Sequence, residues 1–293
     1  MVVRQPFERS GSLVEDVVVA AILAASLLHA SWHALVKSTG DRVIALGGMN
    51  AVSAAVSLAL LPFASPLPAM AFWIIAGSVV LHFAYKVALS RLYRVSDLGQ
   101  AYPLARGLTP LIATALAFLV IGEAPQPDAI AGIALVCGGI ALLAFEGRGR
   151  GVSLSTFAAA LGASLAVAGY SVVDAYGVRM TGDTFSFTVW LMVADGGVFV
   201  AYAFATRRGE VLRAWSAGWG RVLVSGLFGL VSFSVFMWAL GRAPVGAVSA
   251  LRETSVLFAA VIGGLLLGER ANWMRYAAAG AVATGVGIIS LAR

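Results

Sequence analysis

The chain has 293 residues, of which 60% are hydrophobic and only 12% are charged, and its mean hydropathy is +0.91. Soluble domains are about half apolar and about a quarter charged, so this composition excludes an ordinary water-soluble fold. The net charge of +6 does not indicate a nucleic-acid partner, because the arginines stand mainly in short gaps between apolar runs, as in membrane proteins. The lone Cys137 excludes an intramolecular disulfide.

Apolar runs of membrane-spanning length follow one another along the chain after a polar N-terminal segment, residues 1–16. The first run is too long for the core of a signal peptide, and we interpret it as a retained helix. The runs are rich in Gly and Ala and lack the alternation of membrane-barrel strands. The predicted fold class is therefore an all-α integral membrane protein with ten transmembrane helices, at about 17–37, 43–62, 70–92, 97–121, 127–145, 153–178, 185–205, 220–240, 246–267 and 272–292.

The chain also contains a long internal repeat. At an offset of 146 residues an arginine and a Gly-Glu pair coincide, namely Arg106 with Arg252 and Gly122-Glu123 with Gly268-Glu269. Earlier in the chain, KSTGD (37–41) matches RMTGD (179–183). Chance explains matches of Ala, Leu and Gly in apolar sequences, but rarely matches of Arg and Gly-Glu. We predict two five-helix repeats, residues 17–147 and 148–293.

Five helices is an odd number, so the second repeat must enter the membrane upside down relative to the first. We therefore predict two inverted repeats around a central cavity, the arrangement that supports alternating access in transporters. The gaps after odd-numbered helices hold 12 Lys and Arg residues, against 5 on the other side. The positive-inside rule then places both termini outside the cytoplasm.

The duplicated Gly-Glu pairs, together with AYPLARGLTP (101–110) and SALRETS (249–255), carry a resemblance to the drug/metabolite transporter superfamily, of the ten-helix EamA type. The resemblance covers essentially the whole chain, and within the family the chain is similar to bacterial aromatic amino-acid exporters. It implies export of amino acids or other metabolites across the bacterial inner membrane, with cytoplasmic termini, which conflicts with the charge count. Ser249 and Val256 stand where the first repeat has Pro103 and Pro110. The fourth helix is therefore expected to bend at its prolines, whereas the sequence leaves open whether the ninth helix bends.

The third predicted helix carries polar groups on one face. His82, Tyr85 and Lys86 follow the spacing i, i+3, i+4, and such groups are costly against lipid. They suit a zwitterion with an aromatic or polar side chain, and we predict that they line the substrate cavity. In the alternative, Lys86 extends along the helix to the membrane interface.

Other candidate substrate-binding residues lie on the first and sixth helices. Trp32 either lines the cavity or anchors the helix at the interface. His29 and His33 have the spacing of metal ligands, but no Cys, Asp or Glu in this helix completes a site, so no metal is expected. Asp174, one turn after Tyr170, either binds a substrate ammonium, carries a proton, or pairs with His29, His33 or Lys86 of a neighbouring helix.

The remaining candidates are aromatic and acidic. Tyr102 of the fourth helix, with Phe236 and Trp238 of the eighth, is predicted to form an apolar wall for a ligand ring, with lipid-facing positions as the alternative. Asp195 is followed by Gly-Gly, and we assign it to helix packing. Glu123 and Glu269 are predicted to cap helix ends at the surface.

The two arginines of the repeat stand about two turns inside their predicted helices. A guanidinium is well shaped for a substrate carboxylate, but an asymmetric substrate touches the two halves differently, and both halves keep the arginine. We therefore assign Arg106 and Arg252 to helix tying or gating. Glu253 has no acidic counterpart in the first repeat, and we expect it to neutralise Arg252 or to contact the interface.

These patterns predict a secondary transporter that exports aromatic or other neutral amino acids, works as a monomer in membrane lipid, and needs no cofactor. No phosphate-binding loop indicates ATP use. No nucleophile–base set or metal triad indicates an intramembrane enzyme. The alternative function is a proton-coupled exporter of drugs or organic cations, with Asp174 as the carboxylate that both cation and proton share.

Overall fold

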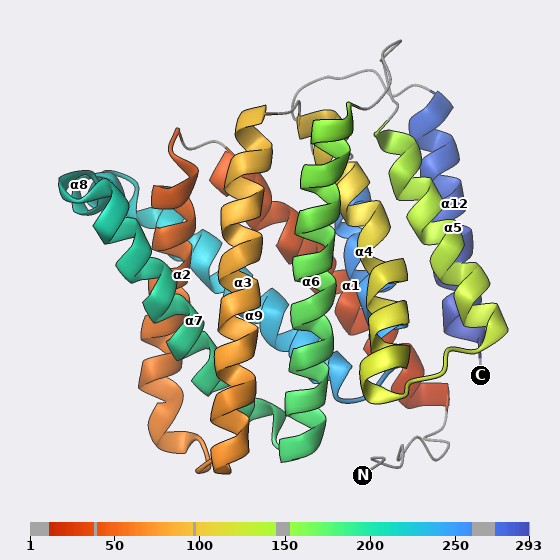
Figure 1. Ribbon diagram of the computed structural model, residues 1–293, viewed down its shortest axis with the longest axis horizontal. Helices are drawn as coiled ribbons and strands as arrows, with labels where there is room; N and C mark the ends of the chain where they lie inside the picture. Colours follow the sequence, from red (N-terminus) through yellow and green to blue (C-terminus); the bar gives the residue numbers. More distant parts are fainter. Residues whose placement is uncertain (1–11, 38–39, 96–97, 145–152, 260–272, 293) are drawn as a thin grey trace.

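The computed structural model describes residues 12–37, 40–95, 98–144, 153–259 and 273–292, and this part of the chain is helical without strands. Eight of its helices are long and apolar enough to cross a membrane, which supports a multi-pass membrane protein. The helices stand side by side (Figure 1). Their bounds are α1 Ser12–Lys37, α2 Arg42–Leu60, η1 Leu61–Phe63, α3 Ala69–Val95, α4 Leu98–Ile121, α5 Pro127–Leu143, α6 Leu154–Thr181, α7 Thr184–Arg207, α8 Gly209–Ala217, α9 Trp219–Leu240, α10 Val245–Glu253 and α12 Trp273–Leu291.

Two segments differ from the expected helix pattern. The predicted gap between residues 205 and 220 contains α8, whose Glu, Leu, Arg and Ala are good helix formers although the segment is too polar to span a membrane. The predicted helix 246–267 is interrupted, because α10 ends at Glu253, Thr254 forms a turn, and helix resumes over 255–259. The Thr254 hydroxyl donates to the carbonyl of Leu251, which supports this break. The rest of that prediction lies outside the described residues.

The repeated Thr-Gly-Asp motif begins a helix in both of its copies. Asp41 caps α2 by accepting hydrogen bonds from the backbone N–H groups of Val43 and Ile44, and Asp183 caps α7 by accepting one from Ser186. Burial raises the pKa of Asp41, but hydrogen bonds from Arg207 and from the helix backbone outweigh it and leave the pKa below its usual value. The hydrogen bonds from Ser186 lower the pKa of Asp183. Both carboxylates are therefore held in the charged, capping form.

The first Gly-Glu pair joins two helices. Gly122 has a φ of 71°, which favours glycine, and the N–H of Glu123 donates back to the carbonyl of Ala117 to close the end of α4. The Glu123 carboxylate then accepts from the backbone N–H of Val245, at the start of α10, and from Arg179. Glu123 does cap a helix, but it is buried, and our prediction that it lies at the surface is wrong. Glu269 lies outside the described residues.

Small residues bring helices from the two halves of the sequence into close contact. At one end of the bundle α5 packs on α12 (Figure 1), and a Cβ added at Gly132 would lie 2.8 Å from the carbonyl oxygen of Gly285. Such close approach is typical of helices packed in lipid. Elsewhere α3 packs on α6 and α9 on α1, while α2 packs on both α7 and α9, and α7 also contacts α3. The middle of the bundle is therefore built from helices of both halves of the sequence.

Candidate functional site

A cavity lined by both polar and apolar side chains lies in the middle of the bundle, with a volume of ≈ 80 Å³. Such a volume holds a few water molecules, so the described conformation must widen before it admits a larger solute. Seven helices contribute to its wall, α1, α2, α3, α6, α7, α9 and α10. The lining residues are His29, Trp32, Leu46, Met49, Asn50, Ser53, His82, Tyr85, Lys86, Leu89, Tyr170, Met192, Asp195, Gly229, Ser232, Phe233 and Arg252.

Arg106 on α4 is the centre of a buried network beside this cavity. Its Nη1 donates to both carboxylate oxygens of Glu253, at 3.0 and 3.1 Å, and its Nη2 lies 3.1 Å from the hydroxyl of Tyr85. The Nε2 atoms of His29 and His33 lie 3.1 and 3.3 Å from the same Nη2. Both members of the ion pair are nearly inaccessible to solvent. The pair therefore ties α4 to α10. We had predicted that Glu253 neutralises Arg252, but its carboxylate binds Arg106 instead.

Arg252 has different surroundings although it occupies the matching position in the repeat. Its Nη2 donates to the hydroxyl of Tyr170 at 2.8 Å, and its guanidinium carbon lies 4.2 Å from the centre of the Phe236 ring. Its Nη1 is buried and has no hydrogen-bond partner within the described part of the chain. A desolvated guanidinium nitrogen without an acceptor is costly, so this atom is a candidate ligand-binding group.

A second buried ion pair joins α3 to α7. The Lys86 ammonium donates to Asp195 Oδ2 at 2.6 Å and to the side-chain oxygen of Asn50 at 2.8 Å. It also lies 4.9 Å from the centre of the Phe199 ring. Lys86 therefore faces the bundle interior and does not extend to the interface. Asp195, which we had assigned to packing, binds this lysine and keeps one oxygen, Oδ1, without a partner among the described residues.

Asp174 lies behind the cavity wall and is fully buried. One of its oxygens accepts from the hydroxyl of Ser78, and the other lies 3.9 Å from Nε2 of His82. The His82 ring stacks on that of Tyr170, with centres 3.9 Å apart. The contacts of Asp174 are therefore with His82 and Ser78 of α3, and its predicted pairing with His29, His33 or Lys86 is not found among the described residues.

The helices that carry the two arginines both depart from regular structure near them. In α4, Pro103 and Pro110 lie inside the helix and flank Arg106, and a proline inside a helix removes a hydrogen bond and bends it. Without prolines, α10 breaks immediately after Arg252 and Glu253. The helix α4 stays continuous over Leu98–Ile121, whereas α10 is interrupted beside Arg252, and interrupted helices are typical of transporter binding sites.

Among the predicted substrate-binding residues, five line the cavity together: Trp32, His82, Tyr85, Lys86 and Tyr170. Asp174 contacts this group from behind, and Arg106 binds Tyr85. Trp238 lies apart at the C-terminal end of α9, where the guanidinium of Arg242 covers its ring at 4.6 Å. The side chain of Tyr102 lies outside the described residues. Glu253, Asn50 and Asp195 were missed as site residues, because nothing in the sequence shows which buried acid meets which base.

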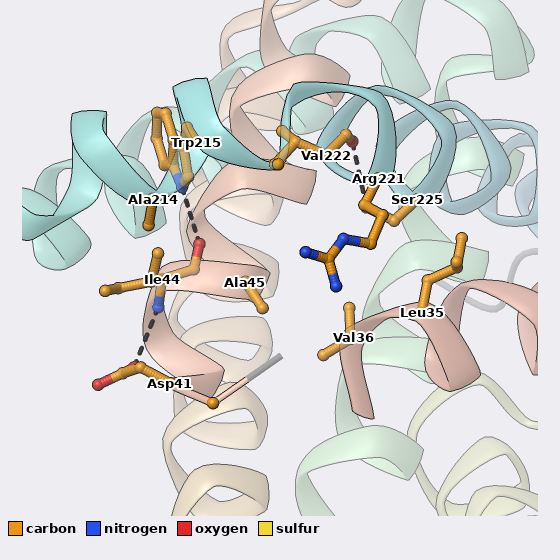
Figure 2. A pocket seen from close by; sticks show the side chains of 12 residues that line it. Leu35, Val36, Asp41, Ile44, Ala45, Ala214, Trp215, Arg221, Val222 and Ser225 are labelled. Atoms are coloured by element: carbon orange, nitrogen blue, oxygen red, sulfur yellow. Dashed lines mark hydrogen bonds between the residues drawn. The ribbon is translucent and has the colours of Figure 1, made fainter. Parts of the chain in front are cut away.

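A second pocket lies at the end of the bundle, between the C-terminal end of α1 and the starts of α2 and α9 (Figure 2). Figure 2 shows Trp215 of α8 donating to the carbonyl of Ile44, with the Arg221 side chain reaching toward Val36. Asp41, the acid in its lining, is already bound by Arg207. The buried polar groups described above are absent from its lining, so we assign solute recognition to the central cavity.

Comparisons with known proteins agree with this fold. The profile of the EamA-like transporter family matches residues 154–291, so the second half of the chain is similar to this family, whose members are transporters and not enzymes. A crystal structure described only as that of a protein has a TM-score of 0.74 and 16% sequence identity, and the match covers 95% of this chain and 96% of that chain. This likeness shows the fold alone. No curated protein matches the chain, and the narrower similarity to aromatic amino-acid exporters stays a prediction.

Proposed function

We propose that this protein is a secondary transporter that exports amino acids, aromatic or other neutral ones, across the bacterial inner membrane by alternating access. The premise is the EamA-like transporter domain over residues 154–291. The observation that carries the proposal is the pairing of unsatisfied groups in one cavity wall, Arg252 Nη1 as a donor and Asp195 Oδ1 as an acceptor. A free amino acid presents the complementary carboxylate and ammonium.

The aromatic lining supports the same substrate class. Trp32, Tyr170 and Phe233 line the cavity, and the Tyr170 ring already stacks on His82. Aromatic side chains offer a large apolar contact area, and Trp and Tyr also offer a polar group. A neutral or aromatic side chain fits this wall without burying a further charge.

The helix contacts support the inverted repeats and the cavity between them. If α1, α2 and α3 correspond to α6, α7 and α9, the contact of α3 with α6 corresponds to that of α9 with α1. The contact of α2 with α9 likewise corresponds to that of α7 with α3. Each contact thus has a counterpart in which the two halves exchange roles, which favours a site that opens alternately to each side.

We infer ten membrane-crossing segments from the same correspondence. Eight helices are long enough by themselves, and the 17 residues of α5 reach about 26 Å, close to the thickness of the hydrocarbon core. The tenth crossing would begin with α10 and continue into residues outside the described ranges.

The test is uptake by liposomes that contain only this protein. Labelled Phe, Trp, Met and Thr are offered with and without a proton gradient, with protein-free liposomes as the control. Saturable uptake of a neutral amino acid is expected, with the gradient arm separating passive from coupled transport. Absence of amino-acid uptake under both conditions would contradict the proposal.

Asp174 supports one alternative, a proton-coupled exporter of organic cations. Its Oδ2 has no hydrogen-bond partner among the described residues and lies near His82, so the carboxylate is available to a cation or a proton. In this alternative Asp174→Asn abolishes efflux of a labelled organic cation from the same liposomes. Efflux that survives Asp174→Asn excludes it.

A further inference from the structure

The two arginines at matching repeat positions differ in how completely they are bound. Arg106 has a partner on both of its Nη atoms: Nη1 donates to Glu253 and Nη2 donates to Tyr85. Arg252 donates through Nη2 to Tyr170, and its Nη1 has no partner among the described residues. Both are buried, with exposed fractions of 2% and 9%. Two buried arginines with unequal hydrogen bonding indicate different roles.

No carboxylate neutralises Arg252 within the described ranges. The acid next to it in the chain, Glu253, turns away to bind Arg106. The acid in the cavity wall, Asp195, binds Lys86. A desolvated cation without an anion is destabilising, and the arrangement persists only if something else offsets it.

The free nitrogen also has the right setting for a ligand. Arg252 belongs to the cavity wall, and the Tyr170 hydroxyl that holds Nη2 is part of the same wall. The Phe236 ring, 4.2 Å from the guanidinium carbon, covers one face. The guanidinium is thus held by Tyr170 and Phe236, and Nη1 is a buried donor that has no partner among the described residues and can bind an anion.

Building on the proposed function, we propose that Arg252 binds the carboxylate of the transported amino acid through Nη1, whereas Arg106 holds helices together and does not contact the substrate. This separates two residues that the sequence repeat presents as equivalent. It also assigns the substrate's anionic end to α10, next to the helix break.

The experiment compares each amino acid with its amide, which keeps the ammonium and the side chain and removes the negative charge. Binding of L-phenylalanine, L-tryptophan, L-methionine and L-threonine and of their amides is measured by calorimetry on the detergent-purified full chain. Wild type, Arg252→Gln, Arg252→Lys and Arg106→Gln are compared, with Arg242→Gln, an exposed arginine, as the matched control. The unfolding temperature of each variant shows that it is folded.

We expect wild type to prefer the acid over the amide by about 10-fold to 100-fold, the strength of a charge-assisted hydrogen bond. Arg252→Gln should remove this preference by weakening the acid alone, and Arg252→Lys should keep part of it. Any folded Arg106→Gln protein should retain the preference. If Arg252→Gln still discriminates acid from amide, the inference is wrong while the proposed function stands. If wild type binds neither form of any of the four, both fail.

Discussion

Arg106 and Arg252 are separated by 146 residues and match in the sequence repeat, yet the structure surrounds them differently. The first copy has Gly107 after its arginine and the second has Glu253, and that acid reaches across to the arginine of the other copy. One exchange of Gly for Glu thus saturates Arg106 and leaves Arg252 incompletely bound. The lesson is that a repeat fixes where a charge stands, while the neighbouring residues decide what it does.

The largest expected effect on stability comes from breaking the ion pair between Arg106 and Glu253. Glu253→Gln leaves Arg106 buried without its counterion, which costs about 3 kcal/mol or more. For a chain of this size we expect an unfolding temperature in detergent that is lower by at least about 6 °C. The measurement is thermal unfolding followed by fluorescence, with Glu210→Gln on exposed α8 as the matched control.

A double variant tests whether the cost lies in the unpaired charge. Replacing the pair together, as Arg106→Met with Glu253→Leu, removes both buried charges, so much of the lost stability should return. A Glu253→Gln protein as stable as the wild type would show that the pair does not tie α4 to α10.

Lys86 extends the comparison to a third buried cation. Lys86→Met leaves Asp195 without its cation, and we expect a loss of about 3 kcal/mol, measured as above. The further exchange Asp195→Leu in the same chain should restore most of that stability. Equal stability of Lys86→Met and wild type would mean that water, not Asp195, solvates the lysine.

The connection from α4 to α10 gives a smaller effect. Gly122 has positive φ, and Gly122→Ala should destabilise the protein by about 1 kcal/mol. Gly138 on α5 has no atom within 4 Å of an added Cβ, and Gly138→Ala should be neutral or slightly stabilising in the same unfolding assay. Equal effects of the two substitutions would show that backbone conformation at Gly122 does not matter.

The smallest effect is the dependence of stability on pH through the capping aspartate Asp41. Because the pKa of Asp41 is lowered on folding, its contribution to stability is present above the unfolded pKa, about 3.9, and is lost as pH falls through the folded value. The unfolding temperatures of wild type and Asp41→Asn should therefore converge between about pH 4 and pH 2. Because its ion pair with Arg207 is partly exposed, the difference at pH 7 should be small. A difference that grows on acidification would contradict this assignment.

The sequence predicted the architecture better than the site. Length and hydropathy are properties of each segment alone, so most helices were found, and α8 was missed only because it is short and polar. The face with His82, Tyr85 and Lys86 was found because helical periodicity is local. Which acid meets which base is decided between helices that are far apart in sequence, so the pairs of Glu253 with Arg106 and of Asp195 with Lys86 were not predicted.

The claim that solute crosses through the central cavity is tested most directly by thiol labelling. Ser232 lines the cavity, and the single native cysteine can be removed by Cys137→Ser. In that background we expect Ser232→Cys to react with a small water-soluble thiol reagent and to be protected by the transported amino acid. Ser171→Cys, equally buried but outside the cavity wall, should stay unreactive. Absence of labelling at residue 232, or labelling that the amino acid does not slow, would contradict the account.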